Sequence, residues 1–277
     1  MLWGAWGKEM TKAKRIELIK AAYDAGISSF DHADIYGNYT TEKDFGAAFS
    51  ESGLSREDVQ FITKCGIAMV CENKPYNTKH YNYDSSYIVD AVDASLRQLK
   101  TDYLDLLLLH RPSPLLDPEE VAKAVDSLLS SGKILSFGVS NFTNAQIDLL
   151  AGYVPIHVNQ IEISLTHNDP MFDGQLDYCH RKNILPMSWS PLGILKKPQK
   201  QWPSKLRSAI LKLTEKYDCG YASLALAWLL KHPSNIHPVI GTSNPQRLQE
   251  IVKAQEINLD LEDWFFLLES VKERPCP

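Results

Sequence analysis

The sequence lacks the cysteine patterns that would build a disulfide framework or a zinc site. Its five cysteines are an odd number, and none belongs to a CxxC pair or to a cysteine–histidine pattern with the spacing of zinc ligands. We therefore predict reduced thiols and no bound metal. The 14 glycines form neither a GxGxxG nor a GxxxxGK[ST] motif, which disfavours a Rossmann or P-loop enzyme.

Long hydrophobic runs and strong positive charge are also missing. No segment approaches the roughly 18 apolar residues of a membrane span, and the first residues lack the apolar core of a signal peptide. The net charge is -5, with no lysine or arginine run beyond Lys196, Lys197 and Lys200. These absences argue against a membrane anchor and a nucleic-acid surface. We expect a cytoplasmic protein whose partners are small molecules.

Short apolar segments recur along the chain, each followed by helical periodicity, at the spacing of roughly 30 residues that is typical of βαβ units. Eight segments are predicted to be strands, at residues 2–6, 27–31, 60–64, 103–110, 134–139, 156–161, 184–189 and 237–240. The length of 277 residues is near the roughly 250 residues of a (β/α)8 barrel. The predicted fold is therefore α/β, a (β/α)8 TIM barrel in a single domain, residues 1–277.

Capping residues mark several predicted helices. Asp117 is a predicted N-cap with Pro118 in the first turn, Gly132 a predicted stop, and Thr11 and Ser85 further N-caps. Two helical segments, residues 203–217 and 259–273, are additional to a simple barrel. Long loops at residues 66–84 and 190–203 follow the third and seventh strands, on the face that carries the active site in a barrel.

Polar side chains end several of the predicted strands. They are Asp31, Lys64, His110, Ser140, Asn141 and Gln160. One such residue alone is more often a solvated rim residue, but their convergence predicts a site. Structural interpretations stay open: His110 could cap the core, and Asp31 and Lys64 could form a buried ion pair.

Seven segments carry a resemblance to a known family. They are FDHADIYG, FITKCG, YLDLLLLHRP, GVSNF, NQIE, WSPLG and GTSNPQRL, at residues 30–37, 61–66, 103–112, 138–142, 159–162, 189–193 and 241–248. Their order and spacing resemble the aldo-keto reductase superfamily, in its bacterial NADP-dependent oxidoreductase branch. The resemblance extends from about Trp3 to about Lys253.

This resemblance implies an NADP(H)-dependent reductase of aldehydes or ketones with Asp31, Tyr36, Lys64 and His110 as its catalytic set. Tyr36 would donate the proton to the substrate oxygen, and Lys64 would lower the pKa of Tyr36 from its usual value of about 10. Asp31 would keep Lys64 charged, and His110 would align the substrate.

The resemblance also implies a set of cofactor-binding residues. They are Gly4, Trp6, Ser140, Asn141, Gln160, Trp189, Ser190, Leu192, Gly193, Gly241, Thr242, Ser243, Asn244 and Arg247. Residues 140, 141 and 160 would hold the carboxamide, and Trp189 would stack on the nicotinamide. Residues 190, 192 and 193 would meet the diphosphate. Arg247 would bind the 2′-phosphate, which favours NADP(H) over NAD(H), although it could be an ordinary surface residue. Ile251 stands where many relatives carry a polar group for adenine.

One further departure from the superfamily and two alternative functions complete the expectations. The superfamily usually begins with a β-hairpin that closes the bottom of the barrel, and this chain starts almost on the first strand. The chain could instead be a non-catalytic NADP(H)-binding regulatory subunit, or an NAD(P)-dependent sugar or alcohol dehydrogenase. Aromatic pocket walls are expected from Trp6, Tyr76, Tyr81, Tyr83 and Trp202. We expect a small carbonyl substrate and a monomer or weak homo-oligomer.

Overall fold

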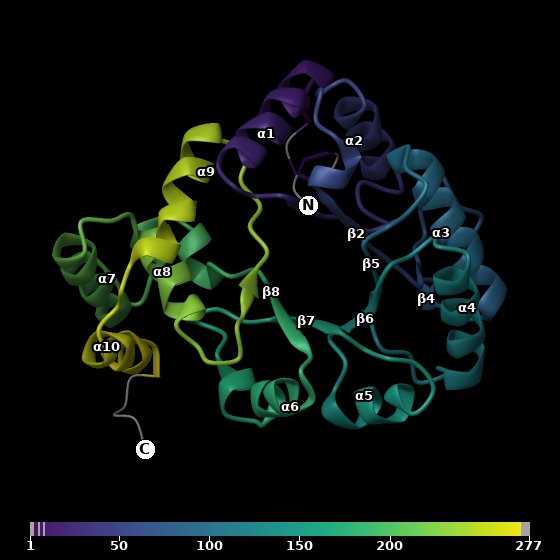
Figure 1. Ribbon diagram of the computed structural model, residues 1–277. Coiled ribbons are helices and arrows are strands. Elements are labelled where there is room, and N and C mark those ends of the chain that lie inside the picture. Colours follow the sequence, from purple (N-terminus) through teal and green to yellow (C-terminus); the bar gives the residue numbers. More distant parts are fainter. Residues whose placement is uncertain (1–2, 5, 8, 273–277) are drawn as a thin grey trace. The chain divides into compact units, whose positions relative to one another are not determined.

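The computed structural model describes residues 3–4, 6–7 and 9–272 (Figure 1). The chain divides into two compact parts, Met1–Asn159 with Gly241–Pro245, and Gln160–Ile240 with Gln246–Pro277. Each part is described by itself, and the single-domain organisation stays a prediction.

The first part is a layer of parallel strands covered by helices. Its strands are β1 (Ser29–Asp31), β2 (Gln60–Cys65), β5 (Leu106–Leu109) and β6 (Phe137–Ser140), joined in parallel in that order. The helices are α1 (Lys12–Asp24), α2 (Thr41–Phe49), α3 (Ser85–Leu99), α4 (Pro118–Ser130) and α5 (Asn144–Ala151), with the 3-10 turn η1 (Arg56–Asp58). Helices α2, α3 and α4 lie on the outer side of the strands (Figure 1). A buried aromatic group, Phe30, Phe45 and Phe61, packs between α2 and the strands.

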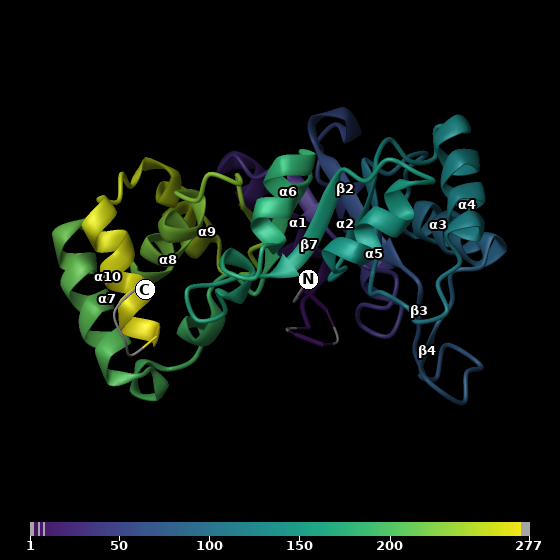
Figure 2. The ribbon, with the colours of Figure 1, turned by 90° about the horizontal axis from the view of Figure 1, so that it is seen from below.

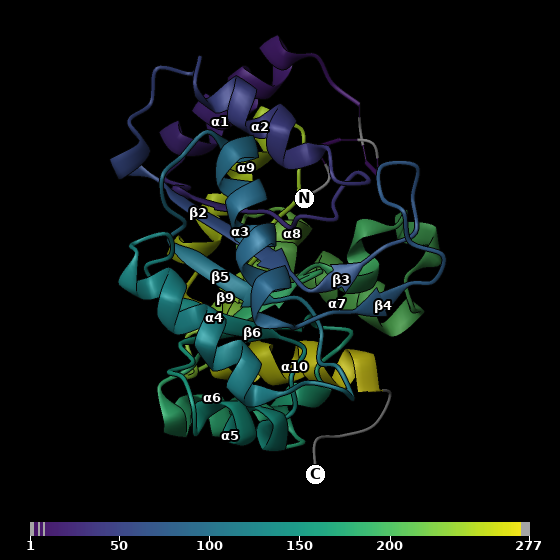
Figure 3. The ribbon, with the colours of Figure 1, turned by 90° about the vertical axis from the view of Figure 1, so that its right-hand side faces the viewer.

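A short antiparallel hairpin lies within the long loop after β2. It is formed by β3 (Ile67–Ala68) and β4 (His80–Tyr81), which Figure 3 shows side by side. The predicted loop of residues 66–84 therefore has regular structure of its own.

The second part consists mainly of helices. They are α6 (Gln175–Lys182), α7 (Ser204–Lys216), α8 (Tyr221–Leu230), α9 (Pro245–Val252) and α10 (Leu261–Lys272), with the 3-10 turns η2 (Asp169–Met171), η3 (Gly193–Lys196), η4 (Gln199–Gln201) and η5 (Lys253–Glu256). Strand β8 (Leu185–Trp189) pairs in parallel with β9 (His237–Pro238). Helices α7 and α10, the two additional helical segments predicted from the sequence, lie side by side (Figure 2).

The strand order confirms an α/β fold with a curled parallel sheet, although the barrel is only partly closed. Strand β7 (Val158–Glu162) carries the chain from the first part to the second, and the order is β1-β2-β5-β6-β7-β8-β9. The described residues thus give this sheet seven strands, whereas eight were predicted. No helix among the described residues is long and apolar enough to cross a membrane.

The prediction of a first strand at residues 2–6 is wrong for the residues described there. Trp3 and Gly4 form a bend, Trp6 and Gly7 belong to a turn, and the amide of Gly7 donates to the carbonyl of Gly4 over 2.8 Å. Glycine at both ends of this short segment favours a turn over an extended strand. Leu2 and the intervening alanine lie outside the described residues.

Capping predictions were confirmed for two of three helices. The side chain of Asp117 accepts from the amide of Glu119, and that of Thr11 from the amide of Lys14. Ser85 was wrongly predicted as an N-cap, since it is the first helical residue and Asp84 precedes it as the cap. The reason is tertiary: the amide of Ser85 donates to a Glu120 carboxylate oxygen on α4, at 3.0 Å.

Gly46 allows the close approach of α2 to α3. A Cβ atom at this position would lie 2.2 Å from the carbonyl oxygen of Gln98 and 2.7 Å from the carbonyl carbon of Leu99. Alanine normally stabilises a helix by about 0.5–1 kcal/mol relative to glycine, but overpacking costs about 1–3 kcal/mol.

We therefore predict that Gly46→Ala lowers the free energy of unfolding, measured by urea titration. Ala47→Gly in the same helix is the control, and it should lower the free energy of unfolding by about 1 kcal/mol. A Gly46→Ala variant as stable as the parent would contradict this packing.

Candidate active site

The carboxyl ends of three adjacent parallel strands bring together the first candidate residues. Asp31 ends β1, Lys64 lies near the end of β2, and His110 follows β5. Lys64 is paired with Leu108 in the register of β2 and β5, and the amide of His110 donates to the carbonyl of Cys65 over 2.9 Å. Because parallel strands end at the same edge, the three side chains share one edge of the first part.

The ammonium group of Lys64 is the best-connected polar group of this edge. Its Nζ donates to Asp31 Oδ1 at 2.8 Å, to Asp31 Oδ2 at 2.7 Å and to the carbonyl oxygen of His32 at 2.7 Å. A fourth acceptor, the phenolic oxygen of Tyr36, lies at 3.4 Å. The side chain of Lys64 is 1% exposed and that of Asp31 11%. A charge buried this completely requires such a set of partners.

Tyr36 is held by an unusual turn after β1. Gly37, Asn38 and Tyr39 follow it with φ angles of 58°, 57° and 67°, and a left-handed backbone at a bulky residue such as Tyr39 is a genuine outlier. The hydroxyl of Thr41 donates to the carbonyl of Tyr36 at 3.1 Å. This turn directs the Tyr36 phenol toward Lys64.

The hydroxyl of Tyr39 fastens the turn to the β3–β4 hairpin. It donates to the carbonyl of Ile67 at 3.1 Å and accepts from the amide of Met69 at 3.0 Å. Burial raises the pKa of Tyr39 to about 12, so this hydroxyl keeps the proton that it donates. These contacts offset the backbone strain and hold the turn in place.

The aromatic rings around Tyr36 complete this group of side chains. The ring of Tyr36 meets the ring of His110 edge-on, with centroids 5.8 Å apart. The exposed Trp6 ring meets Tyr36 at 6.2 Å, and Trp6 Nε1 donates to Asn38 Oδ1 at 3.2 Å. The structure therefore brings all four predicted catalytic residues and Trp6 into one group.

The pKa of Tyr36 is raised rather than lowered, mainly by burial. Burial raises that pKa, Lys64 opposes the shift and Asp31 adds to it. For Lys64 itself, burial acts to lower the pKa, but Asp31 and Tyr36 outweigh burial and raise it. Lys64 does act to lower the pKa of Tyr36, as expected, but burial outweighs this effect and Asp31 adds to the rise, so the net pKa is raised. Tyr36 therefore remains a protonated phenol.

His110 is kept neutral by its surroundings. Burial lowers its pKa well below the usual value, and the positive charges of Lys64 and Arg111 lower it further. Its Nδ1 atom finds no hydrogen-bond partner among the described residues. A neutral imidazole carries one N–H donor and one acceptor nitrogen, so His110 can still donate to an oxygen atom.

Sequence inspection missed several groups behind this edge. The main-chain oxygen of His32 binds Lys64, although the His32 ring is fully buried against Phe45, 4.3 Å between centroids. Glu42 is also buried and accepts from the hydroxyl of Thr63 at 2.5 Å. A main-chain acceptor leaves no trace in the sequence, whereas the helical position of Glu42, facing the strands, was a usable signal.

The residues predicted to bind cofactor fall into both parts of the chain. In the first part, Ser140 ends β6, and Asn141 follows with a φ of 61° and donates from Nδ2 to Ser140 Oγ at 2.7 Å. Thr242 accepts from Trp3 Nε1 through its carbonyl and from the amide of Asn244 through its hydroxyl. Gly4, Gly241 and Ser243 belong to the same part. These residues offer polar atoms at strand ends and in loops.

The second part holds the remaining predicted cofactor residues. Gln160 is buried on β7, and Trp189 is half-buried at the end of β8. Ser190 and Gly193 both have left-handed backbones, with φ angles of 52° and 49°, and the amide of Gly193 donates to the carbonyl of Ser190. Leu192 packs against the core of this part.

Two further positions of the second part bear on nucleotide binding. Arg247 is exposed in the first turns of α9, whereas Ile251 on the same helix is 8% exposed and belongs to the core. The apolar residue at position 251 is thus accounted for by packing. Trp202, expected as a pocket wall, is instead 4% exposed in the core, with Nε1 donating to the carbonyl of Lys197.

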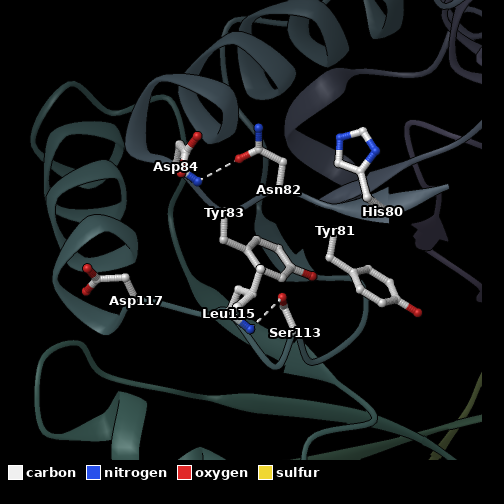
Figure 4. Close-up of a pocket in the computed structure, with 8 residues that line it drawn as sticks. All are labelled: His80, Tyr81, Asn82, Tyr83, Asp84, Ser113, Leu115 and Asp117. Atoms are coloured by element: carbon white, nitrogen blue, oxygen red, sulfur yellow. Dashed lines mark hydrogen bonds between the residues drawn. The ribbon is translucent and has the colours of Figure 1, made fainter. Parts of the chain in front are cut away.

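A hollow of about 230 Å³ opens beside the hairpin in the first part (Figure 4). Residues of the segment 80–84 line it, together with Ser113, Leu115 and Asp117 from the segment before α4. Tyr81 and Tyr83, two of the expected pocket walls, are among them. Tyr76 lies nearby in the same loop, edge-on to His80 with centroids 5.2 Å apart.

Comparison with known proteins agrees with this geometry. The Aldo/keto reductase family model matches residues 1–269. The uncharacterized oxidoreductase YcsN of Bacillus subtilis is 40% identical, with 100% of this chain and 94% of that protein covered. A 6-dehydroglucose reductase of Agrobacterium fabrum is 38% identical, with 90% and 84% covered. The crystal structure of a thermostable aldo-keto reductase in complex with the inhibitor epalrestat has a TM-score of 0.82 at 26% identity, covering 97% of this chain and 93% of the other.

The buried carboxyl of Glu42 predicts a pH dependence of stability. Burial raises its pKa above the ordinary 4.5, so the unfolded chain ionises first as pH rises, and the free energy of unfolding falls. Glu42→Gln keeps an acceptor for Thr63 but does not titrate. We expect the melting temperature of the variant to gain on that of the parent between about pH 5 and pH 8. Glu57→Gln, at an exposed position, is the control. A melting temperature of the variant, relative to that of the parent, that stays constant or falls as pH rises would contradict the raised pKa.

Proposed function

The chain belongs to the aldo/keto reductase family of oxidoreductases, and on this premise we propose that it reduces an aldehyde or ketone to an alcohol with NADPH. The observation that carries this proposal is the Tyr36 phenol, 3.4 Å from a Lys64 ammonium that Asp31 holds at 2.7 Å. We assign the catalytic roles to Tyr36, Lys64, Asp31 and His110.

In this proposal Tyr36 is the proton donor. Reduction of a carbonyl places negative charge on its oxygen, which a positioned acid must protonate. The raised pKa of Tyr36 keeps the proton on the phenol until the oxygen becomes basic. Lys64 then stabilises the phenolate that remains, and Asp31 keeps the ammonium charged and oriented.

His110 aligns the substrate. Because its lowered pKa leaves it neutral, its N–H donates to the carbonyl oxygen without competing with Tyr36 as an acid. The ring lies edge-on to Tyr36 at 5.8 Å, so both groups can address one oxygen atom. Proximity of this kind accounts for a large share of enzymatic rate enhancement.

Each part of the chain, taken by itself, offers groups that suit a dinucleotide. In the first part Ser140 and Asn141 offer hydroxyl and amide groups for a carboxamide. In the second part Gln160 offers an amide and Trp189 a half-buried aromatic face. A Cβ atom at Gly193 would lie 2.2 Å from Thr166 Oγ1, so only glycine keeps this turn, with its backbone amides, beside polar groups. When bound, NADPH supplies the hydride that reduces the carbonyl carbon.

The substrate class is proposed from a relative. A 6-dehydroglucose reductase is 38% identical to this chain, so carbonyl sugars head the substrate panel, followed by small aldehydes, diketones and aromatic ketones. We propose a cytoplasmic enzyme for small carbonyl compounds, which the net charge of -5 supports. The reverse reaction, as a sugar or alcohol dehydrogenase, uses the same groups.

Replacement of Tyr36 tests the proton donor. We predict that Tyr36→Phe lowers kcat about 10²- to 10⁴-fold, the usual contribution of a general acid, and leaves the Kd for NADPH nearly unchanged. The measurements are NADPH consumption with the substrate panel and fluorescence titration of NADPH. Tyr103→Phe, just before β5, is the matched control.

Two outcomes would contradict the reductase proposal. An unaffected Tyr36→Phe variant would remove Tyr36 from the reaction. Tight NADPH binding with no turnover of any panel compound would instead favour a regulatory NADP(H)-binding subunit.

Replacement of Arg247 tests the cofactor preference. A charge-assisted hydrogen bond is worth about 1.5–3 kcal/mol, so Arg247→Ala should raise the Kd for NADPH about 10- to 100-fold. The Kd for NADH, which lacks the 2′-phosphate, should change little. Arg207→Ala, an exposed arginine on α7, is the control. Equal losses for both nucleotides would show that Arg247 does not read the phosphate.

A further inference from the structure

Tyr83, just after the β3–β4 hairpin, grips the main chain of the residue that follows His110. Its hydroxyl donates to the carbonyl of Arg111 at 2.5 Å and accepts from the amide of Arg111 at 3.2 Å. One phenol thus satisfies both main-chain groups of one loop residue. Burial raises the pKa of Tyr83, so the hydroxyl keeps the proton that its donor role requires.

The ring of Tyr83 is fixed by its contact with Gly66. A Cβ atom on Gly66 would lie 1.9 Å from Tyr83 Cε1 and 2.7 Å from its hydroxyl oxygen. Gly66 also has a φ of 107°, a backbone region that glycine alone adopts readily. The amide of Asn82 donates to the carbonyl of Gly66 at 2.9 Å. The ring therefore packs against Gly66, just after β2, and its hydroxyl binds the main chain of Arg111.

The main chain around His110 is held by hydrogen bonds on both sides. The amide of His110 donates to the carbonyl of Cys65, the residue before Gly66, and the next residue, Arg111, is held by Tyr83. The main chain is thus held on one side of His110 by Cys65 at the end of β2, and on the other by Tyr83, which packs against Gly66. On the imidazole, Nδ1 finds no hydrogen-bond partner among the described residues, and the ring meets that of Tyr36 edge-on. The position of the ring therefore depends in part on its anchored main chain.

We infer that Tyr83 is a positioning residue for His110, acting through the main chain of Arg111. This inference rests on the alignment role proposed for His110. Tyr83 lines the hollow beside the hairpin (Figure 4), and it touches the proposed substrate only through the residues it holds. A merely structural tyrosine would affect stability, whereas a positioning one affects His110 specifically.

A double-mutant cycle separates these two roles. The variants are Tyr83→Phe, His110→Gln and their combination, compared by kcat/KM with the panel compound that is turned over fastest. We expect Tyr83→Phe to lower kcat/KM about 10- to 100-fold, because small misplacements of an aligning group have effects of this size. In the His110→Gln background the same change should alter kcat/KM by less than about twofold, because residues that act through one another are not additive.

An NMR measurement tests the positioning without any turnover. With 15N-labelled histidine, the ring signals of His110 are assigned by their loss in His110→Gln. Tyr83→Phe should shift or broaden these signals. Tyr103→Phe, which removes a hydroxyl just before β5, should not. The Kd for NADPH should be the same in both tyrosine variants. If Tyr83→Phe fails to fold, Tyr83→Met replaces it in both experiments.

The failures are distinguishable. Wild-type kcat/KM in His110→Gln would overturn the alignment role in the proposed function, and with it this inference. A normal loss in His110→Gln, combined with wild-type kcat/KM and unshifted His110 signals in Tyr83→Phe, would overturn the inference alone. An equal loss from Tyr83→Phe in both backgrounds would overturn it as well, since Tyr83 would then act by another route.

Discussion

The buried ammonium group of Lys64 is the constraint on which the rest of the candidate site depends. Burying a charge is unfavourable unless every donor finds an acceptor, and the chain supplies these acceptors from one side. Asp31 ends the neighbouring strand, the carbonyl of His32 is the next main-chain acceptor, and the phenol of Tyr36 follows after a turn. The parallel register of β1 and β2 fixes the first two automatically. The third requires the left-handed turn at residues 37–39.

This pairing also determines the electrostatics of the site. A lysine beside a phenol favours the phenolate, but burial outweighs this effect of Lys64 and Asp31 partly opposes it, so the pKa of Tyr36 is raised. The same burial keeps His110 neutral. The resting site therefore holds an ion pair of nearly zero net charge flanked by two neutral hydrogen-bonding groups. Such a site is suited to donating a proton to an oxygen that becomes basic during the reaction.

The sequence predicted those parts of the site that depend on strand periodicity. Apolar runs located the ends of β1, β2 and β5, and thereby Asp31, Lys64 and His110, because residues at the ends of parallel strands must share an edge. The caps at Asp117 and Thr11 were also readable, since they depend on local hydrogen bonds. Features that depend on tertiary contacts could not be predicted from the sequence. The main-chain oxygen of His32 has no sequence signal. Ser85 is the first residue of α3, with its amide bound to Glu120, and Trp202 lies in the core. The turn at Gly4–Gly7 replaced a predicted strand.

The hairpin in the loop after β2 helps to fix the positions of the four candidate catalytic side chains. Lys64 and Asp31 are held by the sheet itself, but Tyr36 and His110 lie beyond strand ends and need outside support. Two phenols supply it: Tyr39 binds the main chain of Ile67 and Met69, and Tyr83 binds that of Arg111. Both supports run through main-chain atoms, which any residue except proline at positions 69 and 111 would provide. Side chains of the hairpin that face the hollow can therefore vary without disturbing the ion pair of Asp31 and Lys64.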